Sequence, residues 1–173
     1  MAKLQIISDS GEFEIQLHEN SAPATCAYFA YLARSGFLDA SSIFRIVAPA
    51  NHRPDDECPI NVVQMGPLQA LKGTRHRILH ENTRITGLSH RKWTVSAARF
   101  DRQQLYGNFF VCMQDEPSLD FGGARQPDGQ GFAAFGEVVS GFDTLEDVFA
   151  KAESDEFLEH AIPIRAVRLI NGE

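Results

Sequence analysis

Several histidines lie close enough together in the sequence to suggest a metal site. His76 and His80 are four residues apart, Glu81 follows directly, and His90 lies ten residues further on. Imidazole and carboxylate groups at such spacings can bind zinc. A helix that placed the first two histidines on one side would run through a stretch crowded with lysine and arginine, whose charges repel one another. We therefore expect neither a metal nor a cofactor, and a metal-dependent enzyme is the distant alternative.

Motifs for nucleophilic and phosphate chemistry are missing from the sequence. A serine in a Gly-x-Ser-x-Gly turn would indicate an esterase-type nucleophile, and the chain has none. The glycine-rich stretch 122–131 lacks the Gly-Lys-Ser/Thr ending of a phosphate-binding loop. Cys112 lies inside an apolar run, where a cysteine behaves as a small buried hydrophobe. These classes of enzyme are therefore not favoured.

An arginine in the middle of an apolar segment suggests a different chemistry. Arg45 lies between Phe44 and Ile46, and arginine is rare in such a strand unless its head group reaches solvent or a partner. It could face outward with its stem packed on neighbours. With Gln64 on a second strand and residues 108–110 (Asn-Phe-Phe) on a third, it could instead line a cleft with a cation, an amide and aromatic walls. The residues alone leave both possibilities open.

Short strands dominate the elements that must position these side chains. A helix is predicted from Pro23, with Ser21 as its cap and Gly36 as its left-handed end, and a second helix follows Asp143. Alternating polar and apolar residues, or runs rich in β-branched residues, predict strands over 3–7, 12–17, 42–47, 60–65, 93–98, 108–113, 135–139 and 162–170.

The order of these elements predicts the fold class. Seven or eight short strands and two helices, without regular alternation of strand and helix, indicate a mainly β chain built as an antiparallel barrel or sandwich. The stretches 48–59, 69–91 and 119–131 show no sustained period and are expected to be loops, which often carry binding sites. No repeat or linker divides the sequence, so residues 1–173 are expected to form a single domain.

The composition indicates a folded protein with a modest negative charge. The chain has 173 residues, 10% of them aromatic, and 16 Lys and Arg against 23 Asp and Glu, a net charge of −7. Disordered chains have fewer aromatic residues and nucleic-acid-binding proteins are usually basic, so neither class is expected. Residues 72–102, the basic region, hold eight Lys and Arg against two acids. This region is either a docking surface for an acidic partner or a solvated loop region.

Cysteine usage and hydropathy predict a cytoplasmic protein. Cys26, Cys58 and Cys112 are odd in number and far apart, so they form neither a disulfide framework nor a Cys-x-x-Cys motif. No apolar run approaches the roughly 18 residues of a membrane span, and residues 1–10 show no secretory signal. We therefore expect no membrane partner.

The order of motifs along the chain resembles that of the cyclophilins, a family of peptidyl-prolyl isomerases. The resemblance implies a closed eight-stranded antiparallel barrel capped by two α-helices, and the stretch from Pro127 to Gly136 is similar to a bacterial subgroup. The segments that carry it span almost the whole sequence: Gly11-Glu-Phe-Glu-Ile-Gln-Leu, Ala22-Pro23-Ala-Thr, Leu38 to Val47, Asn61-Val-Val-Gln64-Met-Gly66, Thr94-Val-Ser-Ala-Ala-Arg99, Gly107-Asn-Phe-Phe110, Leu119-Asp120 and Phe135-Gly136-Glu-Val-Val-x-Gly141.

The resemblance implies that the chain speeds rotation about the peptide bond that precedes proline in polypeptides. Amide resonance keeps this bond planar behind a barrier of about 18–20 kcal/mol. No bond is made or broken, so the enzyme must bind the twisted amide better than either planar form. Arg45 matches the family's catalytic arginine, whose permanent charge stabilises the twisted amide, and Gln64 matches the glutamine that orients it.

The resemblance also assigns the residues that hold the substrate. Phe110 and Leu119 match two walls of the proline pocket, and the backbone of Ala98 and Arg99 matches the edge that pairs with the substrate chain. The chain departs from the family pattern at several positions around this pocket: Phe44 stands for a histidine, Asn61 and Val62 for a Phe-Met pair, Asn108 for a glutamine, Ser118 for a tryptophan and Phe132 for a histidine.

These departures remove apolar surface from the expected pocket at positions 61 and 62 and add some at position 132. At about 25 cal/mol per Å², trimming an aromatic wall costs about one or two kcal/mol of substrate affinity. We therefore expect a monomeric isomerase of weakened or narrowed activity. We also expect poor sensitivity to cyclosporin-type inhibitors, which contact the family's tryptophan. The alternative is a binding module of the same fold that holds proline peptides or a partner without useful turnover, with the basic region as a further docking surface.

Overall fold

The chain begins with a β-hairpin that supplies two strands of a barrel. In the computed structural model, which describes residues 1–67 and 76–171, β1 (Ala2–Ser8) pairs with β2 (Gly11–Leu17). Gly11 forms the turn with a φ angle of +127°, a conformation that residues with a side chain rarely adopt. Every second residue of both strands is buried, which confirms the alternation seen in the sequence.

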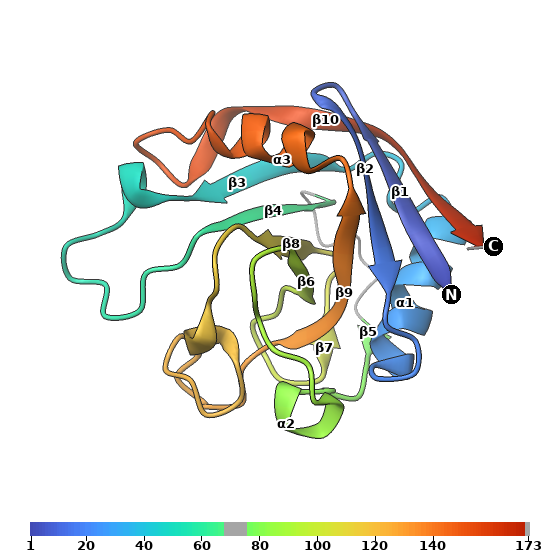
Figure 1. Cartoon of the computed structure of the whole chain (residues 1–173), viewed down its shortest axis with the longest axis horizontal. Coiled ribbons are helices and arrows are strands. Elements are labelled where there is room, and N and C mark those ends of the chain that lie inside the picture. Colours follow the sequence, from blue (N-terminus) through green and yellow to red (C-terminus); the bar gives the residue numbers. More distant parts are fainter. Residues whose placement is uncertain (68–75, 172–173) are drawn as a thin grey trace.

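Eight strands close into an antiparallel barrel, as the resemblance implies. Neighbours around the barrel follow the order β1-β10-β3-β4-β8-β6-β9-β2, and β2 pairs with β1 to complete the ring. Ala2 lies opposite Asn171, so the two ends of the described chain are side by side (Figure 1). The remaining barrel strands are β3 (Ser42–Val47), β4 (Val62–Gly66), β6 (Thr94–Ala97), β8 (Phe109–Cys112), β9 (Ala133–Ser140) and β10 (Phe157–Asn171).

Large apolar side chains fill the inside of the barrel, and two helices cover them. Helix α1 (Pro23–Arg34) inserts Phe29, whose ring stacks on Phe135 with 4.4 Å between centroids and meets Phe109 edge-on at 5.6 Å. Helix α3 (Phe142–Phe149) packs against a different part of the barrel (Figure 1). Removing these side chains from water is the main force that holds the fold together. The two expected covering helices are thus present.

The start of α1 is stabilised by a residue far away in the sequence. The prediction that Ser21 caps this helix is wrong, because the residue before the helix is Ala22, whose side chain has no acceptor. The buried carboxylate of Glu81 accepts hydrogen bonds from Ala24 N (3.0 Å), Thr25 N (2.9 Å) and Thr25 Oγ1 (2.7 Å). Glu81 therefore satisfies N–H groups that helix geometry leaves without a partner, and its charge suits the positive end of the helix.

A one-turn helix lies in the stretch 69–91, which the sequence predicts to be a loop. This helix is α2 (Thr83–Thr86), and the side chain of Asn82 starts it by accepting a main-chain N–H at 3.1 Å. Gly87 ends it in a left-handed conformation (φ +75°), as Gly36 does after α1 (φ +73°). Four residues are too few to show a helical period, which explains why the sequence pattern did not reveal α2.

Part of the basic region, residues 72–75, falls outside the described residues.

Four further short elements of the described chain lie outside the barrel. The short elements are two strands that form a sheet of their own and two 3-10 turns: β5 (His76–Arg77), β7 (Gln104–Leu105), η1 (Pro49–Asn51) and η2 (Pro117–Leu119).

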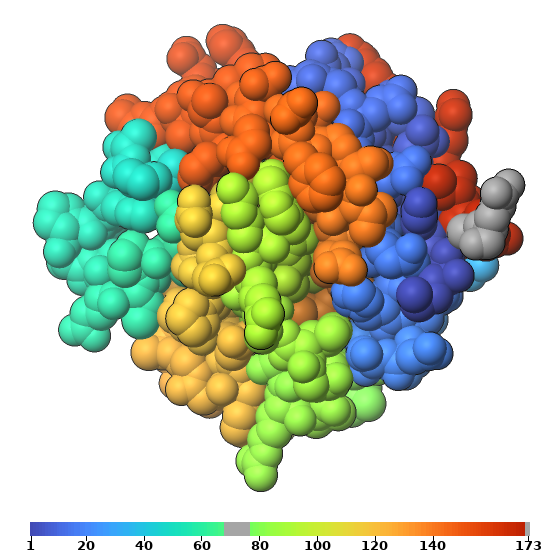
Figure 2. Space-filling view, in the orientation of Figure 1, coloured from blue at the N-terminus to red at the C-terminus, as the bar shows by residue number. Residues whose placement is uncertain are grey.

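Two loops meet on the outer surface near β3 and β4. The connection between β3 and β4, green-blue in Figure 2, protrudes beside the segment that follows η2, yellow to orange in the same view. Arg125 of the second loop donates to Asp56 Oδ2 at 2.9 Å and to Cys58 O at 3.1 Å. These contacts join the two loops that border the candidate site.

Removing the Glu81 carboxylate tests its role at the start of α1. We expect Glu81→Ala to lower the free energy of unfolding by about 2–3 kcal/mol, because it leaves buried N–H groups unpaired. Urea denaturation measures this change. Glu19, an exposed residue whose carboxylate accepts one hydrogen bond from Ala2 N, provides the control, and Glu19→Ala should change stability by no more than about 0.5 kcal/mol. Equal losses in the two variants would contradict the proposed role.

Candidate active site

Three neighbouring strands place Arg45, Gln64 and Phe110 in one row. The register pairs Arg45 of β3 with Gln64 of β4, and Gln64 with Phe110 of β8. Residues directly opposite each other in paired strands project from the same face of a sheet. The adjacent residues Ile46 and Phe109 belong to the barrel core. The row therefore lies on the outer face of the barrel.

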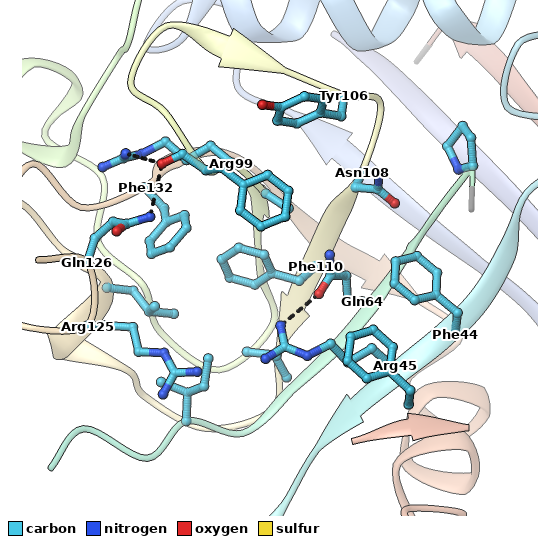
Figure 3. A pocket seen from close by; sticks show the side chains of 17 residues that line it. Phe44, Arg45, Gln64, Arg99, Tyr106, Asn108, Phe110, Arg125, Gln126 and Phe132 are labelled. Atoms are coloured by element: carbon cyan, nitrogen blue, oxygen red, sulfur yellow. Dashed lines mark hydrogen bonds between the residues drawn. The ribbon is translucent and has the colours of Figure 1, made fainter. Parts of the chain in front are cut away.

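A cavity of about 580 Å³ covers this outer face (Figure 3). Loops that follow β3, β6 and β8 contribute to its walls, so the row faces a hollow and not open solvent. All the site residues assigned from the sequence line the cavity except Asn61: Arg45, Val62, Gln64, Ala98, Arg99, Asn108, Phe110, Leu119 and Phe132.

Arg45 is held by partners on two sides while it faces the cavity. Its Nε donates to Glu156 Oε2 at 2.8 Å, and its Nη2 lies 2.6 Å from the same oxygen. Its Nη1 donates to Gln64 Oε1 at 2.9 Å (Figure 3). The side chain is 23% exposed, so it does not extend into bulk water. A guanidinium carries five N–H donors, so one hydrogen on each Nη atom remains for a ligand.

The contact with Arg45 also fixes the orientation of the Gln64 amide. A guanidinium can only donate, so Gln64 turns its oxygen toward Arg45 and keeps its NH₂ group as a donor. Because Gln64 lines the cavity, this NH₂ group can donate to the carbonyl oxygen of a bound peptide.

A second hydrophobic cluster, separate from the barrel core, forms the apolar wall of the cavity. Val62, Phe110 and Leu119 are buried in this cluster, and Phe132 packs against it. The rings of Phe110 and Phe132 meet edge-on, with 5.6 Å between centroids and 86° between their planes. Phe132 is thus part of a wall and does not fill the hollow. An apolar surface of this kind suits a pyrrolidine ring.

Arg99 uses its charge inside the protein. Its Nη1 and Nη2 bind the two carboxylate oxygens of Asp128 at 2.9 and 3.0 Å, and its Nε and Nη2 donate to Gly131 O. The Arg99 guanidinium holds the pKa of the Asp128 carboxyl below its usual value. Its side chain is 1% exposed, so this member of the basic region fastens the loop before β9 and offers no charge to a docking partner.

Asn61 is the assigned residue that does not reach the cavity. Its main-chain N and its side-chain Nδ2 both donate to Glu116 Oε1, at 2.8 and 3.0 Å. Burial raises the pKa of Glu116, and the hydrogen bonds from Asn61 oppose this rise. The neighbouring residues Ile60 and Val62 line the cavity instead. The wall therefore keeps aliphatic surface where the sequence analysis expected a polar side chain.

Asn108 lines the cavity beside a glycine that makes room for it. Gly66 has a φ angle of +140°, and a Cβ atom at this position would lie 2.6 Å from Asn108 Oδ1. This buried oxygen has no hydrogen-bond donor among residues 1–67 and 76–171. On the opposite side, the main-chain oxygen of Asn108 accepts a hydrogen bond from Ala98 N at 3.0 Å.

Several residues of the cavity receive no role from the sequence. Phe44 and Phe157 stack beside Arg45 with 6.3 Å between their centroids, and the Arg45 guanidinium lies 5.7 Å from the centroid of Phe157. Phe100 is 80% exposed and meets Tyr106 edge-on at 5.5 Å. Most of these residues lie in loops, where no period marks them, and exposed aromatic residues between predicted strands are the signal that could reveal them. The other unassigned lining residues are Ile60, Pro67, Arg125 and Gln126.

The histidines considered for metal binding make other contacts. His80 Nε2 lies 3.0 Å from Gln130 O. His90 is buried, with Nδ1 2.7 Å from Asp120 Oδ1 and Nε2 2.8 Å from Ser96 Oγ. Within the described part of the chain, no group of three or more His, Cys, Asp or Glu side chains is arranged to hold a metal ion.

Glu81 and His76 are the remaining members of the metal hypothesis. Glu81 caps α1, and the side chain of His76 lies outside what the structure describes. His90 does connect a serine to an aspartate, in the order of a catalytic triad. However, Ser96 is completely buried, so its hydroxyl cannot attack a substrate.

Comparisons with known proteins decide the family. The family described as cyclophilin type peptidyl-prolyl cis-trans isomerase/CLD matches residues 3–169. The chain belongs to the cyclophilin family. A peptidyl-prolyl cis-trans isomerase of Streptomyces antibioticus is 24% identical to this cyclophilin over 96% of the chain and 95% of that protein. Peptidyl-prolyl cis-trans isomerase B of Escherichia coli is 26% identical, with 90% and 89% covered.

A solved structure supports the same fold. The crystal structure of a cyclophilin type peptidyl-prolyl cis-trans isomerase from Cryptosporidium parvum matches this cyclophilin with a TM-score of 0.73 and 17% identity, over 99% of this chain and 98% of that one. The expected family, barrel and enzyme class are therefore confirmed. Separately, no helix within residues 1–67 and 76–171 combines the length and apolar character needed to cross a membrane.

Paired substitutions at neighbouring positions test which residue contributes to the cavity wall. We expect Ile60→Ala to weaken binding of a short X-Pro peptide about three- to tenfold, because aliphatic contact surface is lost. Asn61→Ala should change the dissociation constant by less than about twofold, because its amide binds Glu116 outside the cavity. NMR titration measures both values, and thermal unfolding verifies that each variant is folded. The reverse pattern would show that Asn61 forms the wall.

Acidification tests the contact between Arg99 and Asp128. The pKa of Asp128 is lower in the folded state than its ordinary value. The contact therefore stabilises the protein fully at pH values above that ordinary pKa. This stabilisation is lost as the pH falls through the lowered pKa. Near pH 7, Asp128→Asn should reduce the free energy of unfolding by no more than about 1 kcal/mol, because the carboxylate is partly exposed. Urea denaturation at about pH 7 and about pH 3 should show the difference from wild type shrinking, and a constant difference would contradict this account.

Proposed function

We propose that this cyclophilin catalyses rotation about X-Pro bonds with Arg45 as its central electrophilic group. The observation that supports the proposal is the row of Arg45, Gln64 and Phe110, which faces one cavity from three paired strands. These side chains combine a permanent cation, an amide donor and an aromatic wall. A prolyl ring and the amide that precedes it can use all three kinds of contact.

The reaction requires stabilisation of a twisted amide and little else. In the planar amide the nitrogen lone pair is shared with the carbonyl group, which produces the barrier of about 18–20 kcal/mol. Rotation out of the plane returns the lone pair to the prolyl nitrogen. A donor that faces this nitrogen binds the twisted form more tightly than either planar form, and this difference in binding lowers the barrier.

Arg45 supplies this donor. The N–H groups that Glu156 and Gln64 leave unused belong to both Nη atoms, and Arg45 lines the cavity. Its partial burial lowers the effective dielectric constant around the charge, which strengthens its action on the lone pair. The guanidinium also keeps its charge throughout the physiological pH range.

The rest of the cavity holds the ring while the carbonyl turns. Val62, Phe110 and Leu119 form the apolar surface against which the pyrrolidine ring packs. The NH₂ group of Gln64 donates to a client carbonyl oxygen and so limits the orientations that the client adopts. Holding one part of the client while another part rotates keeps the rotating bond in a defined position relative to Arg45.

The client chain passes the main chain of Ala98 and Arg99, just after β6. Large exposed rings stand at the rim of the cavity, with Phe100 80% and Phe157 57% exposed. Such rings offer contact surface to apolar side chains on either side of proline. We therefore propose extended, accessible X-Pro segments of polypeptides as clients.

The proposal includes activity that is weaker or narrower than that of family members with the full pattern. Ser118 provides no aromatic wall where the resemblance places a tryptophan, and it does not line the cavity. The missing indole also argues for weak binding of cyclosporin-type inhibitors. Ile60 limits the loss, because its aliphatic side chain adds to the wall beside Val62.

A binding module without useful turnover is the second candidate. The contact between Arg45 and Glu156 favours it, because a carboxylate oxygen 2.6 Å from Nη2 competes with a client for the cation. The exposed cations Arg84, Arg91 and Lys92 of the basic region would then add a docking surface for an acidic partner.

We further propose that residues 1–173 act as a single monomeric domain in the cytoplasm. Cys26, Cys58 and Cys112 are free thiols, which suits a reducing compartment. Each barrel strand has partners on both sides, so the barrel offers no strand edge to a second copy. The net charge of −7 argues against nucleic acid as a partner.

Substitution of Arg45 tests the proposed catalysis. We expect Arg45→Ala to reduce the acceleration of X-Pro exchange at least about 100-fold, because the donor to the prolyl nitrogen is lost. NMR exchange spectroscopy on a panel of X-Pro peptides measures the rates. Arg165→Ala provides the control, because this exposed arginine pairs with Asp9 outside the cavity, and its rate should equal the wild-type rate. If the wild type changes the chemical shifts of the peptides without accelerating X-Pro exchange, this result would instead support the binding module.

A further inference from the structure

Arg45 has an anionic partner to which the sequence assigns no role. Glu156 precedes β10, and its Oε2 lies 2.8 Å from Arg45 Nε and 2.6 Å from Nη2. The two side chains are about equally shielded, with 23% of Arg45 and 22% of Glu156 exposed. No other acidic side chain in the described part of the chain forms an ion pair with Arg45. Shielding from water makes such a contact stronger than a typical surface ion pair.

The main chain that carries Glu156 is attached to the strand that carries Arg45. Glu156 O accepts a hydrogen bond from Ile46 N at 2.8 Å, and the next residue, Phe157, is the register partner of Arg45. Asn51 adds a second connection, because its Nδ2 donates to Ile46 O at 2.9 Å and to Glu153 O at 3.0 Å. The carboxylate therefore approaches Arg45 from a backbone that is itself fixed to β3.

The Glu156 carboxylate belongs to a second cavity and does not line the apolar one. This second cavity of about 440 Å³ has charged walls, and both Arg45 and Glu156 line it. Arg45 also lines the apolar cavity, whereas Glu156 does not. Arg45 thus lines both cavities. Glu156 binds its Nε edge from the charged side, Gln64 binds Nη1, and the remaining N–H groups can face the client.

We propose that Glu156 is a positioning residue, which holds the Arg45 guanidinium in the orientation that acts on the twisted amide. This inference rests on the proposed isomerase function. A free arginine side chain samples many rotamers, and few of them aim a donor at the prolyl nitrogen. Displacing a catalytic group by about 1 Å can cost about 100-fold in rate. Glu156 and Gln64 together remove these alternatives before the client binds.

A different role for the same carboxylate predicts the opposite result. If Glu156 mainly reduced the positive charge of Arg45, its removal would free the cation and raise the rate. A Gln side chain separates the two roles, because it keeps an acceptor oxygen of similar reach and carries no charge. Under positioning, Glu156→Gln keeps the rate and Glu156→Ala loses it, whereas under charge reduction both variants become faster.

The experiment compares the wild type with Glu156→Gln, Glu156→Ala and a control variant. NMR exchange at saturating X-Pro peptide gives the catalysed rate, and NMR titration gives the affinity. We expect Glu156→Ala to be about 10- to 100-fold slower, with a dissociation constant within about twofold of wild type. Glu156→Gln should stay within about threefold in rate. Asp9→Ala removes an exposed ion pair with Arg165 and should leave both values unchanged.

A spectroscopic readout keeps the contact separate from the activity. The Arg45 Nε–Hε signal, assigned by its loss in Arg45→Ala, should exchange slowly with water in the wild type and in Glu156→Gln, and rapidly in Glu156→Ala. An active wild type with an equally fast or faster Glu156→Ala variant overturns the positioning role and leaves the proposed function intact. A wild type without any acceleration overturns the proposed function itself, and the positioning role with it.

Discussion

The register between β3 and β4 is the constraint on which the candidate active site depends. After a register shift between Ile43 and Arg45, side chains of β3 alternate between its two faces, so a shift by one residue from Arg45 onward would turn Arg45 inward and Ile46 outward. An unpaired guanidinium among the buried side chains of Val63 and Phe109 would cost several kcal/mol. The apolar core thus selects one register, and the same register presents the arginine to the outer cavity. Folding and site formation therefore depend on the same register.

Ion pairs hold in place the loops that form the walls of a largely apolar cavity. Arg99 fastens the loop before β9 through Asp128, and Arg125 joins the segment after η2 to the β3–β4 connection through Asp56. These contacts join the loops that carry apolar lining residues and pair both arginines with carboxylates. Arg45 is the exception in the proposed function, because its charge acts on the client while Glu156 and Gln64 occupy the rest of its donors.

The sequence predicts the position of a residue well when that position depends on the residue's own segment. It predicts poorly a contact with a residue far away in the chain. Arg45 and Gln64 lie in strands that their apolar neighbours mark in the sequence, so these strands could be predicted. The residues alone left open whether Arg45 faces solvent or a cleft, and the family resemblance supplied that placement and the proposed roles. Glu156 lies 111 residues from Arg45 in the sequence, and no local pattern predicts such a contact. For the same reason Ser21 seemed a suitable cap, although the distant Glu81 performs that task.

Asn61 lies outside the cavity for another physical reason. It follows a long connection with three prolines, and no hydrophobic period fixes the phase of residues at the end of such a loop. Ile60 and Val62 therefore occupy the wall while Asn61 turns to Glu116. Phe100 lies in a connecting segment, and Phe157 begins β10 five residues before the strand predicted over 162–170, so no strand period marked either ring.

Closure of the barrel also limits how the protein can bind a polypeptide. Because each of the eight strands already has a neighbour on both sides, a client cannot join the sheet as a ninth strand. In the proposed function the client instead uses side-chain contacts and the main-chain groups just after β6. In the proposed function both the cis and the trans product can therefore leave without breaking a ladder of main-chain hydrogen bonds.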